Sequence, residues 1–191
     1  MDTADLITLD RLRDGYGFTI APGSRTEAMY ERLIPAASLA CLHFVGRDLH
    51  LRQVTEYQDG NGHDRLMLDE KPVASIVSLS VDALHAFASS LDPSLYRVDG
   101  ETGIVTLYGM QTPYVKDCIR VVYMAGYEAI PADIEAAVAD TIQMMARRVT
   151  GVAGGVTSRT MADGGTEQLE TVAPTDYAKF LLRAYRRNLV R

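Results

Sequence analysis

The sequence predicts an α+β protein: a mainly helical bundle with a protruding β-hairpin or small antiparallel sheet, closed by a tethered C-terminal helix. Three observations support this class. Apolar residues recur at helical spacing before residue 46 and after residue 131, apolar and polar residues alternate between them, and a glycine-bearing stretch without periodicity precedes the last helix. At 191 residues with 47% hydrophobic residues, the chain is long enough for one core plus an appendage.

The first two helices are marked by their capping residues. Thr8 is expected to cap a short helix that ends near Gly15. The capping box "SRTE" at residues 24–27 predicts a helix to about Val45 that stops at Gly46 and is kinked at Pro35. The apolar face expected for this helix comprises Met29, Leu33, Ala37, Ala40 and Phe44, with Tyr30, Ile34 and Cys41 beside them.

The clearest helix begins at Pro131, which suits a first helical turn, and runs through "ADIEAAVADTIQMMARR". Acidic residues follow the proline and two arginines close the segment, which matches the helix dipole. The residues expected to form its buried face are Ile134, Val138, Ile142, Met145 and Val149.

The middle of the chain predicts strands. They are expected at residues 50–58, 65–70, 73–82, 95–99, 104–109 and 117–127, with Gly103 in the turn of the hairpin formed by the fourth and fifth. Residues 83–93 are expected to form a loop with a helical turn.

The segment "QDGNGHDRLMLDE" at residues 58–70 allows two interpretations. Asp59, Asn61 and His63 alternate and Glu70 stands twelfth, as in a calcium loop, but the sixth position, where that loop needs glycine, is Asp64. The flanks alternate like strands, and Asp-Gly and Asn-Gly are strong hairpin signals. The segment is therefore predicted to be a hairpin with its turn at residues 59–64 and no bound metal.

No motif for chemistry occurs: the four histidines lack zinc spacing, and neither a phosphate loop nor a nucleophile elbow is found. We therefore expect no catalytic, cofactor-binding or metal-ligating residues and no cofactor. The alternative left open is a small cytosolic α+β enzyme whose site is assembled from scattered polar residues such as Asp59, His63 and Arg65. The acidic N-terminus and the lack of a long apolar run predict a soluble protein with no membrane partner.

The segment from Pro174 carries five basic residues and one acidic residue, a net charge of +4, against −6 for the whole chain. A basic amphipathic helix after a flexible stretch is typical of docking to an acidic partner, but it is equally compatible with packing on its own domain. The domains expected are a core at 1–149, a linker at 150–173 and a docking helix at 174–191.

Five stretches give the chain a family resemblance: "DLITLDRLRDGYGF" (5–18), "LIPAASLACLHFVGRDL" (33–49), "TEYQDGNGHDRLMLDEKPVASIVSLSVD" (55–82), "VYMAGYEAIPADIEAAV" (122–138) and "LLRAYRRNLVR" (181–191). In these stretches the chain resembles the head–tail connector proteins of tailed bacteriophages, the adaptor or head completion family. "AGY" followed by "IP" at a helix start is the most specific of them.

The resemblance implies a virion protein of the head–tail junction, made in the host bacterial cytoplasm. It implies a homo-oligomeric ring, commonly a dodecamer, that docks beneath the portal protein, passes double-stranded DNA without specific binding and supports a stopper or tail-completion protein. Another neck component is the neighbouring alternative. The residues expected to dock the portal are Tyr177, Phe180, Leu181, Arg183, Tyr185, Arg186 and Arg187, and those expected on an intersubunit β-ribbon are Tyr57, Asp59, Asn61, His63 and Arg65.

Overall fold

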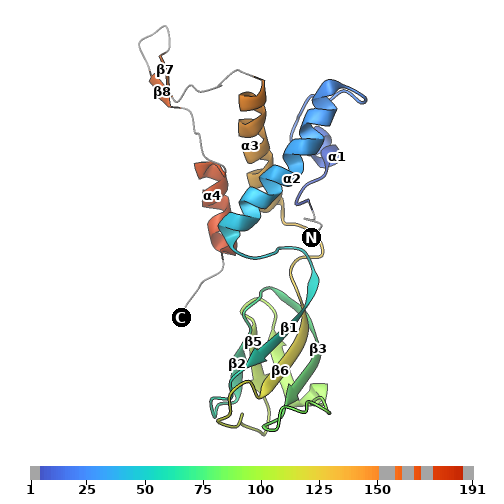
Figure 1. Cartoon of the computed structure of the whole chain (residues 1–191), viewed down its shortest axis with the longest axis vertical. Coiled ribbons are helices and arrows are strands. Elements are labelled where there is room, and N and C mark those ends of the chain that lie inside the picture. The colour runs from blue at the N-terminus through green and yellow to red at the C-terminus, as the bar shows by residue number, and fades with distance from the viewer. Residues whose placement is uncertain (1–4, 151–157, 161–165, 169–173, 187–191) are drawn as a thin grey trace. The chain divides into compact units, whose positions relative to one another are not determined.

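The computed structural model describes residues 5–150, 158–160, 166–168 and 174–186 (Figure 1). The chain divides into two compact units. A helical unit comprises the residues up to Asp48 and those from Ile130 onward, and a β unit comprises Leu49–Ala129. The α+β class is confirmed, but "mainly helical" is off, because the β unit holds two antiparallel sheets rather than one ribbon.

The helical unit contains α1 (Leu9–Gly15), α2 (Arg25–Val45), α3 (Ala132–Val149) and α4 (Asp176–Leu182), which continues into a 3-10 turn, Arg183–Tyr185. The predicted caps are confirmed. Thr8 accepts the Arg11 amide at 3.3 Å, and Ser24 accepts the Glu27 amide at 3.1 Å. Gly46 ends α2 in the left-handed region, where glycine meets no steric penalty.

The buried face of α2 differs from the one expected. The fully buried stripe is Ile34, Ala37, Ser38, Cys41 and Val45, whereas Met29, Leu33 and Phe44 are only partly buried. The small residues on this stripe let α3 approach closely, so that the Cys41 thiol lies 3.8 Å from the Thr141 hydroxyl. Large apolar residues therefore lie at the margins of the contact, where there is room for them.

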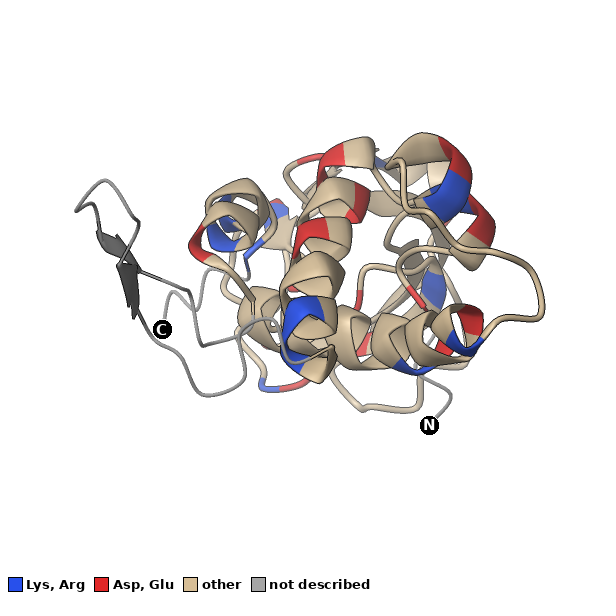
Figure 2. Cartoon of the chain, turned by 90° about the horizontal axis from the view of Figure 1, so that it is seen from above, with Lys and Arg blue, Asp and Glu red and all other residues tan. Residues whose placement is uncertain are grey.

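The prediction for α3 is confirmed over its first three turns, where Ile134, Val138 and Ile142 are fully buried. It is wrong at the end, where Met145 is partly buried and Val149 is 63% exposed. Acidic and basic residues are interspersed along the helices of this unit (Figure 2).

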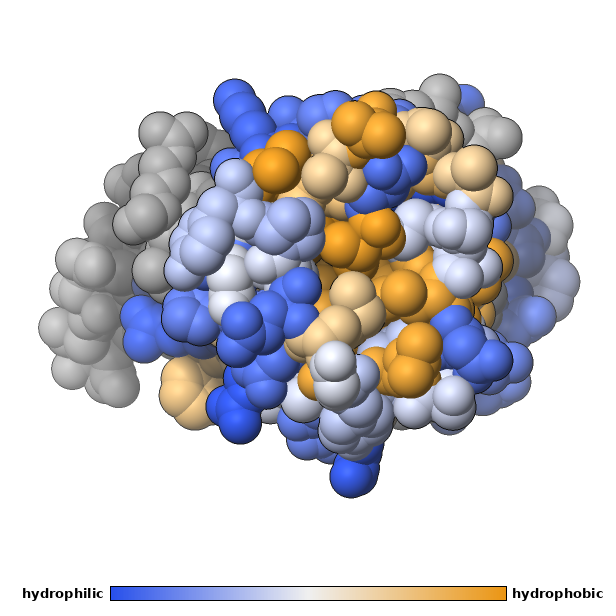
Figure 3. Space-filling model, turned by 90° about the horizontal axis from the view of Figure 1, so that it is seen from below, coloured by the Kyte–Doolittle hydropathy of each residue, from blue (hydrophilic) through white to orange (hydrophobic). Residues whose placement is uncertain are grey.

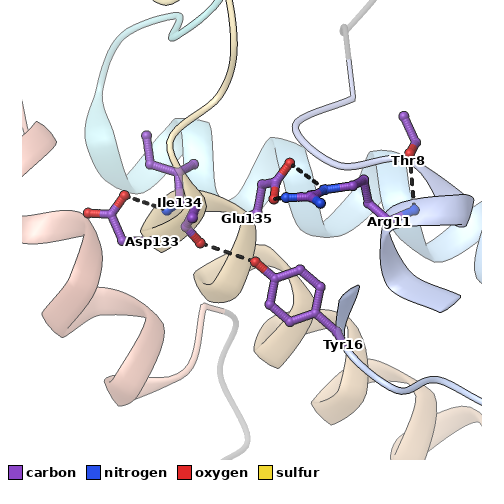
Figure 4. A network of polar contacts seen from close by, with 7 residues as sticks. Thr8, Arg11, Tyr16, Asp133, Ile134 and Glu135 are labelled. Atoms are coloured by element: carbon purple, nitrogen blue, oxygen red, sulfur yellow. Dashed lines mark hydrogen bonds and ion pairs between the residues drawn. The ribbon is translucent and has the colours of Figure 1, made fainter. Parts of the chain in front are cut away.

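A polar network fastens α1 to the start of α3 (Figure 4). The Arg11 guanidinium meets the Glu135 carboxylate at 2.7 Å, and the Tyr16 hydroxyl donates to the Ala132 carbonyl at 3.1 Å. Arg11 is exposed, so solvent screens this pair and its contribution to stability is small. Its role is to fix the position of α1.

The β unit holds two three-stranded antiparallel sheets (Figure 1). One has the order β1-β6-β3, from β1 (Arg52–Gln58), β6 (Ile119–Ala125) and β3 (Val73–Val81). The other has the order β2-β5-β4, from β2 (Arg65–Met67), β5 (Ile104–Leu107) and β4 (Tyr96–Asp99), with a 3-10 turn at Pro93–Leu95. The hydrophobic core of this unit comprises Leu66, Leu68, Val73, Leu79, Val105, Leu107, Cys118, Ile119, Val121, Tyr123 and Ala125.

The predicted hairpin at residues 58–70 is wrong. β1 pairs with β6, with Gln58 opposite Ile119, and β2 pairs with β5, with Leu66 opposite Val105, so residues 59–64 cross from one sheet to the other. The glycines serve other needs: a Cβ on Gly60 would collide with the carbonyl of Pro113, and Gly62 has a φ of +76°. The other predicted hairpin, β4 to β5 with Gly103 in its turn, is confirmed.

Within the segment expected to be a linker, β7 (Ser158–Thr160) pairs antiparallel with β8 (Thr166–Gln168). Its other residues after Thr150 lie outside the described part of the chain. Among the described residues, no helix combines the length and apolarity needed to cross a bilayer.

Candidate interaction surfaces

The inner face of α4 packs against α3 and α2. Thr175 caps the helix by accepting the Ala178 amide at 3.0 Å, and its hydroxyl donates to the Asp140 carboxylate of α3. Ala178 and Leu182 are fully buried. The helix therefore packs on its own unit, the second of the two interpretations left open by the sequence.

Two further contacts hold the end of this segment. The Tyr185 hydroxyl donates to the Asp133 carboxylate of α3 at 2.6 Å, and the Arg186 guanidinium lies 5.6 Å from the ring centre of Phe44 in α2. A cation over an aromatic ring is attracted by its quadrupole. Tyr185 and Arg186, both expected at the portal, thus also have partners within the chain.

The outer face of α4 remains open. Tyr177 is 57% exposed and Phe180 is 69% exposed, with Arg183 exposed one turn further on. Leu181 is partly buried, and Arg187 lies outside the described residues. Of the residues expected to dock the portal, Tyr177, Phe180 and Arg183 form this outer face.

Most of the residues expected on the intersubunit ribbon line a groove in the β unit. The β2 groove has a volume of about 430 Å³ and is lined by Gln58, Asp59, Asn61, His63, Asp64, Arg65, Leu66, Met67 and Ile104. Four of the five expected ribbon residues line it; Tyr57 does not, and instead packs edge-on against Phe87 at 5.7 Å. Asp59 also accepts the Asp117 amide at 2.8 Å, which fixes the loop beside the groove.

A partly buried polar network joins β1 to β6. The Tyr123 hydroxyl of β6 donates to Glu56 of β1 at 2.6 Å, and the Glu70 amide donates to the same hydroxyl at 3.2 Å. Burial, together with the Glu56 carboxylate, raises the pKa of Tyr123 well above its usual range. The phenol stays neutral and acts as a structural donor.

The described side chains that could bind a metal ion or act as a thiolate are those of His, Cys, Asp and Glu. Among them, no group of three or more His, Cys, Asp or Glu side chains could hold a metal ion. Both cysteines are buried, and burial raises the pKa of the Cys41 thiol to about 11, which keeps it from acting as a thiolate nucleophile.

Sequence reasoning missed three of the most exposed apolar side chains of the β unit: Met67, Leu84 and Tyr114. Leu84 and Tyr114 lie outside the strands, in segments between them, where a large apolar residue has no alternating pattern to place it in the core. A large apolar residue in a segment predicted to be a loop was therefore the signal in the sequence that could have identified Leu84 and Tyr114.

Exposed apolar side chains on fixed supports are common to the outer face of α4 and the β2 groove. Exposed apolar side chains of this kind are frequent where proteins contact other proteins. The family model of the head completion proteins matches residues 5–187, so the chain belongs to the head completion protein family. This confirms the resemblance seen in the sequence and gives the chain a role in head completion.

Solved structures of particle necks share the fold. The chain is similar to one from the neck of an empty gene transfer agent (GTA) particle computed with C6 symmetry, with a TM-score of 0.59 and 15% identity over 97% of this chain and 92% of that chain. It is also similar to one from the neck of a native GTA particle computed with C12 symmetry, with a TM-score of 0.55 and 17% identity over 91% and 95%. The comparison with curated proteins found no match.

Proposed function

We propose that the chain is a non-enzymatic structural subunit of the head–tail neck of a phage-type virion. It forms a homo-oligomeric ring beneath the portal protein, extends the channel for double-stranded DNA and supports a stopper or tail-completion protein. It is made in the host bacterial cytoplasm and then becomes part of the virion. The observation that carries this proposal is the family match over residues 5–187.

The ring is proposed from the similar neck structures, which were computed with sixfold and twelvefold symmetry. Twelve copies of one subunit would satisfy both symmetries. Cyclic assemblies of this kind need two different surfaces on each subunit, so that each copy contacts a neighbour on either side.

The portal contact is proposed for the outer face of α4. Tyr177 and Phe180 supply large apolar area, and aromatic side chains often dominate the binding energy of an interface. The inner face already fixes the helix through Thr175 and Leu182, so the helix loses little conformational entropy when a partner binds. Arg183 on the same segment favours an acidic surface on the partner.

The charge distribution suits a conduit for DNA. The β unit carries 11 acidic and 6 basic residues, a net charge of −5, and the rest of the chain carries −1. Tight non-specific binding to DNA requires many contacts from basic residues to phosphates. An acidic ring lets the duplex slide without being held.

The enzyme alternative has one favourable observation, since Asp59, His63 and Arg65 line the same groove. However, the Asp59 carboxylate already accepts the Asp117 amide, and the described residues that line the groove include no Ser, Thr, Cys or Lys side chain. The neck role therefore has the stronger support.

A pull-down with the portal protein encoded alongside this chain tests the proposal. The parent protein should be retained, and the double variant Tyr177→Ser with Phe180→Ser should lose retention at least tenfold, because one buried aromatic side chain contributes roughly 1.5–3 kcal/mol. Val149→Ser removes an equally exposed apolar residue elsewhere on the helical unit and is the control. Equal retention of the double variant and the control would exclude α4 as the docking surface.

A further inference from the structure

Leu84 is the most exposed large apolar side chain described, at 88%. It lies in a loop, residues 82–87, that is named here the Leu84 loop. The Asp82 carboxylate holds this loop by accepting the amides of Leu84, Ala86 and Phe87 at 2.8, 3.0 and 2.9 Å. These hydrogen bonds also lower the pKa of Asp82, so the carboxylate that organises the loop is charged at neutral pH.

The loop is held in a conformation that an unconstrained chain would avoid. His85 and Phe87 have φ angles of +59° and +47°, in the left-handed region that non-glycine residues rarely occupy. Contacts on both residues enforce it. The His85 ring is bonded to the Lys116 carbonyl at 2.8 Å, and Arg120 donates to the Phe87 carbonyl at 3.1 Å. Backbone strain of this kind persists where surrounding contacts fix a segment, and such segments are frequent at binding sites.

The aromatic ring of Phe87 anchors the loop to one face of the β1-β6-β3 sheet. It packs on Tyr57 of β1 at 5.7 Å and under the Arg120 guanidinium of β6 at 5.0 Å. In these contacts Leu84 takes part through its amide, and its side chain is left exposed. Leu84 is presented outward on a fixed support. Figure 3 shows that apolar residues gather on one face of the molecule.

The β2 groove offers a complementary site on the same unit. Met67, which is 62% exposed, lines the groove with Leu66 and Ile104, and these side chains supply its apolar surface. Methionine adapts its shape to an incoming apolar group. At about 430 Å³ the groove has room for a leucine side chain and the backbone that carries it.

The loop and the groove lie on opposite faces of the sheet. Phe87 packs on Tyr57, whereas the next residue, Gln58, lines the groove and donates to the Met67 carbonyl at 2.6 Å. Consecutive residues of a strand point to opposite faces, so a copy does not reach its own groove with its own loop. Both surfaces are therefore free to be used at once by two different neighbours.

Part of the charge around the two surfaces is complementary, although the loop also contains Asp82 and the groove is also lined by Arg65. Lys116, which fixes His85 through its carbonyl, is exposed beside the Leu84 loop, and Asp59 and Asp64 line the groove. We propose that the Leu84 loop of one copy inserts into the β2 groove of a second copy. This contact is heterologous, and repetition with the right rotation closes a ring. The inference rests on the proposed function, to which it adds the residues that join neighbouring subunits.

Cysteine cross-linking on portal-bearing particles tests the contact. Leu84→Cys combined with Met67→Cys should give a ladder of disulfide-linked multimers under mild oxidation, while each single variant should not. The two native cysteines are buried and do not interfere. Val77→Cys combined with Met67→Cys is the control, because Val77 is also exposed but lies in β3, away from the loop. A Leu84–Met67 pair that cross-links no better than the control overturns the inference.

Self-association measured by sedimentation provides an independent test. Leu84→Asp should weaken it at least tenfold, and Val77→Asp should not. Lys116→Glu and Asp64→Lys should each weaken it, and the double variant should recover part of the loss. A Leu84→Asp protein that still forms rings but fails to join the tail would overturn the inference and assign the loop to another neck protein.

The portal pull-down separates this inference from the proposed function. A cross-linked ladder without portal retention would refute docking through α4 and leave the contact between copies standing. Portal retention without a ladder would refute the contact between copies and leave docking through α4 standing.

Discussion

The two faces of α4 should respond oppositely to the same kind of substitution. Leu182 is fully buried against the helical unit, and Phe180, two residues earlier, is 69% exposed. Leu182→Ala and Phe180→Ala both shorten an apolar side chain in one short helix. If α4 belongs to the core through its inner face and binds the portal through its outer face, the first variant loses stability and the second loses binding.

The expected magnitudes follow from burial. Removing a fully buried leucine side chain costs about 2–5 kcal/mol, from lost transfer free energy and the cavity left behind. Phe180→Ala leaves no internal cavity, so its effect on the free energy of unfolding should stay within about 0.5 kcal/mol. For a unit of this size, the loss at Leu182 corresponds to a Tm lower by ~10 °C or more.

Thermal melting followed by circular dichroism, with portal pull-down on the same samples, measures both effects. Leu182→Ala should melt early, and Phe180→Ala should melt like the parent yet bind portal more weakly. If Leu182→Ala melts like the parent, the packing of α4 described above is refuted. If Phe180→Ala binds portal normally, its outer face is not the docking surface.

Three further predictions concern the interior and the loop at residues 59–64. Val138→Asp should cost several kcal/mol, because it places an unpaired charge in the helical core, and a parental Tm would contradict the phase given for α3. Adding calcium to a chelated sample should leave the Tm unchanged, whereas a rise of several degrees would reveal a native-state site at residues 59–64. The pKa of Tyr123 is raised in the folded state, so its stabilising effect is complete below about pH 10 and is lost as the pH rises further. Alkaline titration of the unfolding free energy should therefore show a shallower decline for Tyr123→Phe, and an unchanged slope would count against the Glu56–Tyr123 network.

Local signals in the sequence predicted local structure well. The caps at Thr8 and Ser24 each satisfy an otherwise unpaired amide three residues later, and a pattern confined to so few residues can be recognised in the sequence. The β4–β5 hairpin was also predicted from a local pattern, because its turn at Gly103 joins strands that are adjacent in the sequence.

Pairings between distant residues were not predicted. β1 pairs with β6 across some sixty residues, and nothing in "QDGNGHD" shows that the strands on either side of it join different sheets. Gly60 was read as a turn residue, but the close approach of Pro113 explains it. The expected face of α2 was right at Ala37 but wrong at Leu33 and Phe44, which are only partly buried, because contact with the partner helix decides which residues are covered.

The candidate sites were predicted in part. Aromatic and basic residues at 177–187 identified α4, but composition could not show that Tyr185 and Leu182 turn inward while Phe180 turns outward. Asp59, Asn61, His63 and Arg65 were expected on an intersubunit ribbon from the family resemblance; they line one groove, although the hairpin expected to carry them does not form. The Leu84 loop was not identified, because its geometry depends on contacts with Lys116 and Arg120 from a distant part of the chain.

Imaging of portal-bearing particles tests the central claim most directly. Particles assembled without this chain should end at the portal, and adding the purified protein should produce a closed ring of new density below it, visible by cryo-electron microscopy with symmetry averaging. Inside that density, α4 should face the portal. Particles that acquire no ring, or that carry the protein elsewhere than at the portal vertex, would contradict the account.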